Sequence, residues 1–155
     1  MNILVTGGTG FVGKPLVESL LSRGDTVTVL TRSVEKAQAV FSEKTPQFLT
    51  ALSTLKDLNT FDAVINLAGE PIFDKKWTVQ QKEKLRRSRI DLTQQLVQLI
   101  NQSEYPPALI SGSATGIYGN CGEDVITEDT NPSIQFTAQL CIDWENAAKQ
   151  GRCNA

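Results

Sequence analysis

The 155-residue sequence predicts an α/β fold, in which a doubly wound parallel sheet carries helices on both faces. Short apolar runs alternate along the chain with segments of helical periodicity, as successive βαβ units require. Hydrophobic residues make up 40% of the chain and charged residues 21%, which is the composition of an ordinary globular domain. We find no internal repeat and no low-complexity stretch.

Five short runs predict the strands of this sheet. The second is rich in β-branched residues, the third is weak, and the fourth is almost wholly apolar, as a strand buried on both faces should be. The runs are 2–6, 26–31, 47–50, 63–68 and 108–111.

Four segments between and after these runs predict helices: 11–23, 33–42, 79–102 and 136–150. In the first, apolar residues including Val17 and Leu20 line one face, and Gly24 supplies a stop. Ser33 is a suitable N-cap for the second. Residues 112–132 contain several glycines and predict a long loop.

Composition excludes several classes of protein. The net charge of −2 argues against nucleic-acid binding. The absence of histidine argues against catalytic triads and zinc sites that use this residue. The three cysteines show no metal or disulfide spacing, so we expect a reducing, cytoplasmic location. The N-terminal residues lack the pattern of a signal peptide, and no apolar run predicts a membrane span.

A glycine-rich turn joins the first strand to the first helix. Gly7, Gly10 and Gly13 permit a tight turn and a close approach of the backbone to a pyrophosphate, with Phe11 and Val12 between them. The helix that follows presents free N–H groups to an anion. A preceding strand and a following amphipathic helix are the context that this motif needs. We therefore predict a Rossmann-type domain that binds a dinucleotide.

The end of the second strand indicates which dinucleotide. An NAD site usually carries an acid there, but this strand ends with Arg32 and Ser33. Arg32 can bind a 2′-phosphate, with Ser33 assisting, or it is a solvated surface arginine. NADP is favoured, and NAD remains an alternative.

The chain also resembles a known family. Its glycine turn, the run from Asn66 to Ile72, and the segments 111–119 and 140–145 resemble an extended short-chain dehydrogenase/reductase. Together with Trp77 and the pair Ser88-Arg89 they resemble, more narrowly, the atypical nucleotide-sugar epimerase-like family. The resemblance implies NAD(P) binding and hydride transfer at a carbon of a nucleotide-linked sugar.

The resemblance also marks catalytic candidates. The Tyr-x-x-x-Lys pair of short-chain dehydrogenases is replaced by Thr137 and Cys141, neither of which can supply a phenolate base beside a lysine. The family serine is present as Ser113, which would hold a sugar hydroxyl or carbonyl. Tyr118 or Cys141 would then have to replace the base. The alternative function is a non-catalytic NAD(P)-binding module or sensor.

Three further features remain open. Arg89 lies on the apolar stripe of the third helix, so it needs a buried partner unless its side chain reaches out to solvent. Cys141 is either reactive or an ordinary core thiol. Asn66, Ala68 and Gly69 follow a buried strand, where the adenosine half of a cofactor runs, although Asn66 has the alternative of bonding only to backbone.

Members of the resembled family are roughly twice as long, as a dinucleotide domain plus a substrate lobe implies. We therefore expect residues 1–150 to form the dinucleotide domain and 151–155 a tail, in the N-terminal portion of a longer protein or in a truncated product. An uncovered sheet edge would favour a homo-oligomer. Trp77, Phe136 and Trp144 are expected in the core.

Overall fold

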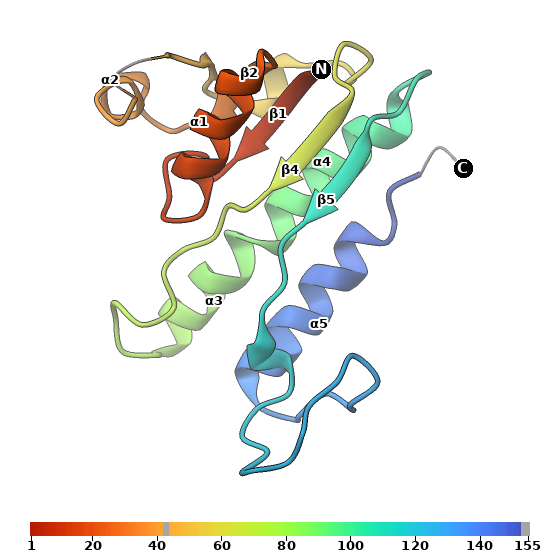
Figure 1. The fold of residues 1–155 in the computed structure, drawn as a ribbon. Helices are drawn as coiled ribbons and strands as arrows, with labels where there is room; N and C mark the ends of the chain where they lie inside the picture. The colour runs from red at the N-terminus through yellow and green to blue at the C-terminus, as the bar shows by residue number, and fades with distance from the viewer. Residues whose placement is uncertain (42–43, 153–155) are drawn as a thin grey trace.

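A computed structural model describes residues 1–41 and 44–152 and contains the predicted parallel sheet (Figure 1). Every neighbouring pair of strands is parallel, in the order β3-β2-β1-β4-β5. The order reverses between β1 and β4, which is the place where doubly wound sheets bind ligands. The strands are β1 Asn2–Thr6, β2 Thr26–Leu30, β3 Gln47–Leu49, β4 Ala63–Asn66 and β5 Ala108–Ser111.

Helices cover both faces of this sheet, as predicted. Helix α1 packs on one face and α4 on the other, with α5 beside α4 (Figure 1). The helices are α1 Gly13–Arg23, α2 Val34–Gln38, α3 Val79–Arg87, α4 Ile90–Gln102 and α5 Phe136–Ala148, with short 3₁₀ turns at Leu52–Thr54 (η1) and Thr115–Ile117 (η2).

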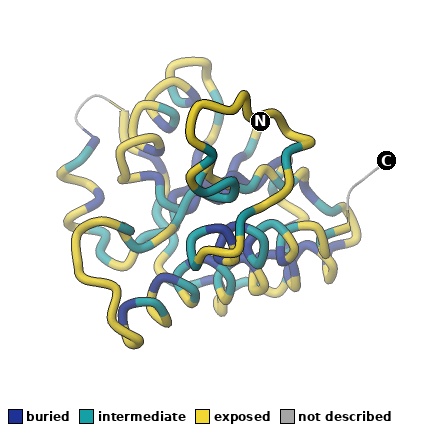
Figure 2. The backbone as a smooth tube through the Cα atoms, turned by 90° about the horizontal axis from the view of Figure 1, so that it is seen from below, coloured by how far each residue is buried: buried dark blue, intermediate teal, exposed yellow. Residues whose placement is uncertain are grey.

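The apolar side chains of the sheet alternate between two cores. Ile3 and Val5 of β1 join Val17 of α1 on one face, whereas Leu4 joins Leu96 of α4 on the other. This alternation follows from the two-residue period of a strand. Figure 2 shows the buried segments gathered in the interior, under loops that are largely exposed.

The first two helices are shorter than the sequence predicted. α1 begins at Gly13 instead of residue 11, because the preceding residues form the turn that Gly10 N closes on Gly7 O at 3.0 Å. α2 begins after Ser33, whose side chain caps it by accepting from Lys36 N, and it ends at Gln38. Residue 42, the predicted end, lies outside the described residues.

The single helix predicted over 79–102 is wrong: the chain breaks it into α3 and α4 at Ser88 and Arg89. The Ser88 hydroxyl donates to Leu85 O at 3.0 Å and accepts from Glu70 N at 2.9 Å. A serine that bonds locally to backbone in this way competes with helical hydrogen bonds. The break lets the chain between β4 and α3 pack against the helix.

β5 is the outer strand of the described sheet on the side of β4. By register, Ile110 lies beside Ile65, yet Ile110 is 57% exposed while Ile65 is buried. The uncovered edge expected from the sequence is therefore present in the described part of the chain. No helix built from the described residues is long and apolar enough to cross a membrane.

Candidate functional site

The glycine turn forms a backbone cradle at the carboxyl end of β1. A Cβ atom on Gly13 would lie 2.1 Å from Gly7 O and 2.7 Å from Gly8 Cα, so no side chain fits there. Gly7 has φ +70°, a conformation that favours glycine, and a Cβ on it would lie 2.7 Å from the backbone of Leu67. The two turns that follow β1 and β4 are thus in backbone contact.

The cradle is open to a ligand. Phe11 is 98% exposed and Val12 61% exposed, so neither is packed into the protein. Val12 precedes α1 without a side-chain hydrogen bond to the helix terminus. A helix N-terminus without a side-chain cap, beside a backbone turn, is the arrangement that binds a pyrophosphate, and these residues therefore fit a dinucleotide.

Asn66 ends β4 and lies inside a buried polar network. Its amide oxygen accepts from Thr6 Oγ1 at 2.7 Å, and its amide nitrogen donates to Thr93 Oγ1 at 2.8 Å and Ser111 Oγ at 3.2 Å. The alternative that Asn66 bonds only to backbone is wrong, because these partners are side chains. Ala68 N donates to the same Thr6 hydroxyl at 3.2 Å. The network fixes the turn that leads to Gly69.

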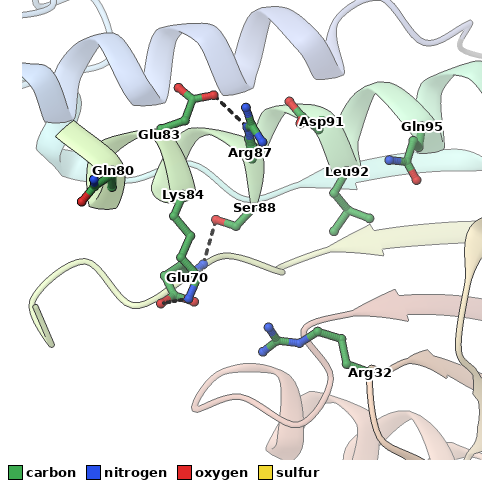
Figure 3. Close-up of a pocket in the computed structure, with 10 residues that line it drawn as sticks. All are labelled: Arg32, Glu70, Gln80, Glu83, Lys84, Arg87, Ser88, Asp91, Leu92 and Gln95. Carbon is green, nitrogen blue, oxygen red and sulfur yellow. Dashed lines mark hydrogen bonds and ion pairs between the residues drawn. The ribbon is translucent and has the colours of Figure 1, made fainter. Parts of the chain in front are cut away.

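A polar pocket opens between the end of β2 and the helices α3 and α4 (Figure 3). Arg32 extends into it from the segment after β2, opposite Glu70, Lys84 and Ser88. Lys84 Nζ lies 3.0 Å from a Glu70 carboxylate oxygen, and the hydrogen bond from Lys84 is the main reason that the pKa of Glu70 lies below its ordinary value. Arg32 thus lines a pocket that contains both cations and carboxylates, and its binding of a 2′-phosphate stays a prediction.

Arg89 is buried, as its place on the stripe predicted. Its Nη1 donates to Glu70 O at 3.1 Å and Leu85 O at 3.3 Å, and its guanidinium lies 5.5 Å from the Trp144 ring centroid. Burial is the main cause that lowers the pKa of Arg89. The expectation of a buried hydrogen-bonding partner is confirmed, and the solvent-reaching alternative is wrong.

Ser113 follows β5 at the same edge of the sheet as the glycine cradle. Its hydroxyl donates to Glu145 Oε1 at 2.5 Å. Glu145 lies on α5, and its other oxygen is 3.6 Å from Lys149 Nζ. Glu145 was not singled out as a site residue from the sequence, although it ends the segment 140–145 that carries part of the family resemblance.

Cys141 is buried beside Arg89 and Glu145. Burial is the largest cause that raises the pKa of its thiol, while a hydrogen bond with the Ala114 backbone opposes this. A raised pKa keeps the thiol protonated, so the structure favours the core reading over the reactive one. Tyr118 is half-buried at the end of η2, and its carbonyl accepts a hydrogen bond from Cys121 Sγ at 3.4 Å.

The aromatic residues divide between core and surface. Trp144 is buried, as expected, and its Nε1 donates to Thr93 Oγ1 at 3.0 Å. The expectation for Trp77 is wrong: it is 40% exposed, donates to Ile72 O and packs on half-buried Phe136 at 5.7 Å between ring centroids. Within residues 1–41 and 44–152, no cluster of three acidic or Cys side chains could hold a metal ion.

The parallel sheet, the reversal of strand order and the glycine cradle define the class: a Rossmann-type NAD(P)-binding fold. The model of the NAD dependent epimerase/dehydratase family matches residues 3–148. The chain belongs to that family.

Similar proteins share this fold over nearly the whole chain. An epimerase family protein SDR39U1 homolog of Arabidopsis thaliana is 35% identical over 154 residues, which cover 96% of this chain and 44% of the relative. The crystal structure of human epimerase family protein SDR39U1 with NADPH has a TM-score of 0.81 at 30% identity, covering 96% of this chain and 48% of that chain.

A nucleoside-diphosphate sugar epimerase from Corynebacterium glutamicum has a TM-score of 0.73 at 29% identity, covering 97% of this chain and 30% of that chain. The chain therefore spans less than half the length of these similar proteins.

Proposed function

We propose that this chain is the cofactor-binding part of an NADP-dependent, epimerase- or reductase-like enzyme that transfers hydride at a carbon of a nucleotide-linked sugar. The observation that carries the proposal is the backbone cradle, in which Gly13 has no room for a Cβ beside Gly7 O. When bound, the nicotinamide ring supplies a hydride acceptor or donor.

Preference for NADP over NAD is supported by the end of β2. Arg32 and Ser33 stand where an acid would otherwise bind a ribose hydroxyl, and Lys84, which pairs with Glu70, lies in the same pocket. A phosphate there would receive charge-assisted hydrogen bonds, whereas the unphosphorylated ribose would not. The similar human protein was crystallised with NADPH.

The nucleotide-sugar substrate is supported by the likeness to the Corynebacterium glutamicum epimerase. Ser113 at the end of β5 would hold the sugar hydroxyl or carbonyl, and Arg89 would keep the turn at Gly69 and Glu70 in place beside the cofactor. Phe11, Val12, Asn66 and Ala68 would border the cofactor through the turns that they form.

Titration of the chain with NADPH and with NADH, followed by cofactor fluorescence, tests the cofactor assignment. We expect tighter binding of NADPH, and Arg32→Ala should weaken NADPH binding roughly tenfold or more with little effect on NADH. Arg23→Ala is the matched control, because Arg23 lies in the last turn of α1, at the end of the helix away from the glycine cradle. Equal affinity for both cofactors in the unsubstituted chain, with no response to Arg32→Ala, would refute NADP preference.

A second candidate function is a cofactor-binding module without turnover. It is favoured by the raised pKa of Cys141 and by Thr137, which leave the family's base position without a proton acceptor. Single-turnover reduction of bound NADP⁺ by UDP-glucose and UDP-glucuronic acid separates the two candidates: the enzyme produces NADPH and the module does not.

Location and assembly complete the proposal. The free thiols of Cys121 and Cys141 support a reducing compartment such as the cytoplasm. The exposed face at Ile110 and the open edge of β5 support a homo-oligomer, which light scattering of the purified chain would detect.

A further inference from the structure

Glu145 and Ser113 form a pair at the carboxyl edge of the sheet that was not predicted from the sequence. The Ser113 hydroxyl donates to Glu145 Oε1 at 2.5 Å, joining the segment after β5 to the middle of α5. Glu145 is partly exposed, and its second oxygen faces Lys149 Nζ at 3.6 Å. The pair is therefore accessible to a ligand, and the Lys149 ammonium group lies near the second oxygen of Glu145.

The neighbours of Ser113 leave Glu145 as the proton acceptor. Among the described residues, the side-chain hydrogen bond of the Ser113 hydroxyl goes to Glu145 alone. The Cys141 thiol, one turn earlier on α5, has a pKa raised by burial, so it stays protonated. Thr137, two turns earlier, carries an aliphatic hydroxyl, which is a poor base.

A hydroxyl that donates to a carboxylate keeps its own oxygen lone pairs free to accept. Ser113 can therefore accept a hydrogen bond from a substrate hydroxyl while Glu145 holds the serine proton. This is the arrangement of a relay in which one proton enters at Ser113 and another leaves to the carboxylate.

We propose that Glu145, acting through Ser113, is the proton acceptor for oxidation of a sugar hydroxyl, a step that rests on the function proposed above. The substrate C–H bond breaks and its hydride passes to the oxidised nicotinamide ring, which becomes the reduced dihydronicotinamide. The substrate O–H proton passes to Ser113 Oγ, and the Ser113 proton passes to Glu145. The carbinol carbon becomes a carbonyl carbon, so electrons and protons balance.

A carboxylate is a strong enough base for this step, because the sugar hydroxyl loses its proton while the hydride departs. A sugar hydroxyl is weakly acidic at rest, but its proton becomes acidic as the hydride departs and the carbonyl forms. A base that is already hydrogen-bonded to the relay accepts the proton without reorganising the site. In the reverse direction, protonated Glu145 returns the proton through Ser113 to the carbonyl oxygen.

Glu145→Gln separates this role from a structural one. The glutamine amide oxygen still accepts from Ser113, so a bond that only fixes α5 to the loop survives, whereas the negative charge and the proton-accepting capacity are lost. Glu104→Gln makes the same chemical change in the exposed segment before β5, at the amino edge of the sheet, and is the matched control.

Two measurements on the full chain test the proposal. The first is the ratio of the dissociation constants of NADP⁺ and NADPH by calorimetry, because a carboxylate near the reacting carbon favours the cationic ring. Glu145→Gln should shift this ratio against NADP⁺ by roughly threefold or more. The second is the single-turnover rate of NADP⁺ reduction by UDP-glucose or UDP-glucuronic acid across pH, where Glu145→Gln and Ser113→Ala should each cost roughly a hundredfold or more.

The outcomes are distinct. A shifted ratio in Glu145→Gln but not in Glu104→Gln supports the assignment even where sugar oxidation is below detection. An unchanged ratio in both variants overturns the role of Glu145 while leaving cofactor binding intact. If the unsubstituted chain binds neither nucleotide, the proposed function fails, and this assignment fails with it.

Discussion

The Arg89 guanidinium occupies the space that a side chain at Gly69 would need. A Cβ atom on Gly69 would lie 2.6 Å from Arg89 Cζ and 2.8 Å from Nη2. The guanidinium is fixed by the carbonyls of Glu70 and Leu85 and lies over the Trp144 ring. The turn after β4 and the break between α3 and α4 therefore depend on one another.

This dependence predicts coupled substitutions. Gly69→Ala should lower the free energy of unfolding by about 1–3 kcal/mol, because Arg89 must leave its carbonyl partners to make room. In an Arg89→Ala background the same substitution should cost much less, so a double-mutant cycle by urea unfolding should give a coupling of about 1 kcal/mol or more. Additive effects of the two substitutions would show that the Arg89 side chain moves aside without changing the free energy of unfolding.

The steric crowding at Gly13 predicts that alanine is tolerated less well there than at an uncrowded surface glycine. Gly13→Ala should lower the free energy of unfolding by about 3 kcal/mol or more and abolish NADPH binding, since the new methyl group meets backbone that cannot move away. Gly24→Ala, at φ +94° with no atom within 4 Å, should cost only about 1–2 kcal/mol of conformational strain. Urea unfolding and fluorescence titration give both values; equal costs at the two sites would contradict the steric account.

Thr93 links three other residues in the buried network. Its hydroxyl accepts from Asn66 and from Trp144 Nε1 and donates to Arg89 O. Thr93→Val keeps the shape but leaves the Trp144 indole N–H and one of the two Asn66 amide N–H groups without a partner, so the free energy of unfolding should fall by about 2–5 kcal/mol. Exposed Thr54→Val should change it by less than about 0.5 kcal/mol. A tolerated Thr93→Val would mean that another acceptor serves both donors.

Asp143 predicts a pH dependence. Desolvation raises the pKa of Asp143, but the hydrogen bonds from Arg86 and Gln139 and the charge of Arg86 outweigh it, so the pKa lies below its ordinary value of 3.8. The carboxylate therefore stabilises the fold above that ordinary pKa, and this contribution is lost as the pH falls through the lower folded value.

Asp143→Asn should accordingly lower the Tm at neutral pH, and the Tm difference from the unsubstituted chain should shrink as the pH falls below the ordinary pKa of aspartate and vanish below the folded value. Thermal unfolding by circular dichroism between acid and neutral pH measures it. A Tm difference that is constant over this range would contradict an ionised Asp143–Arg86 pair.

Cys141 and Cys121 should differ in thiol reactivity. Cys141 is buried and its pKa is raised by burial, whereas Cys121 is partly exposed. In a Cys153→Ser background, iodoacetamide should alkylate Cys121 at least roughly tenfold faster than Cys141 in the folded protein, and the difference should vanish in urea. Mass spectrometry of the peptides gives both rates. Fast labelling of folded Cys141 would revive its reactive interpretation.

Local patterns predicted most of the fold. The strands at 2–6 and 108–111 have the expected bounds, because apolar runs between turn residues define them without reference to the rest of the chain. Gly7 and Gly13 were predictable for a similar reason, since their role depends on backbone geometry within a single turn. Arg89 was predictable because the stripe of Leu85 and Leu92 already assigned it to a buried face.

Features that depend on tertiary contacts were not predictable. The break at Ser88 leaves the apolar spacing of the two helices intact, so periodicity gave no sign of it. Ser113 and Glu145 are 32 positions apart, and only the packing of α5 beside β5 brings them together. The exposure of Trp77 depends on where the loop before α3 lies, which residue type alone does not determine.

The polar row formed by Thr6, Asn66 and Ser111 has a consequence for how the sheet assembles. These three residues are register partners across β1, β4 and β5, and the Asn66 amide bonds to both neighbours. A slip of either junction by one residue would set that amide opposite an aliphatic side chain (Val5 or Ile110) or a glycine (Gly7 or Gly112) and remove its polar partner across the sheet. The three polar residues thus specify the register of β1, β4 and β5. Their apolar residues alone, mostly valine, leucine and isoleucine, would distinguish one register from another only weakly.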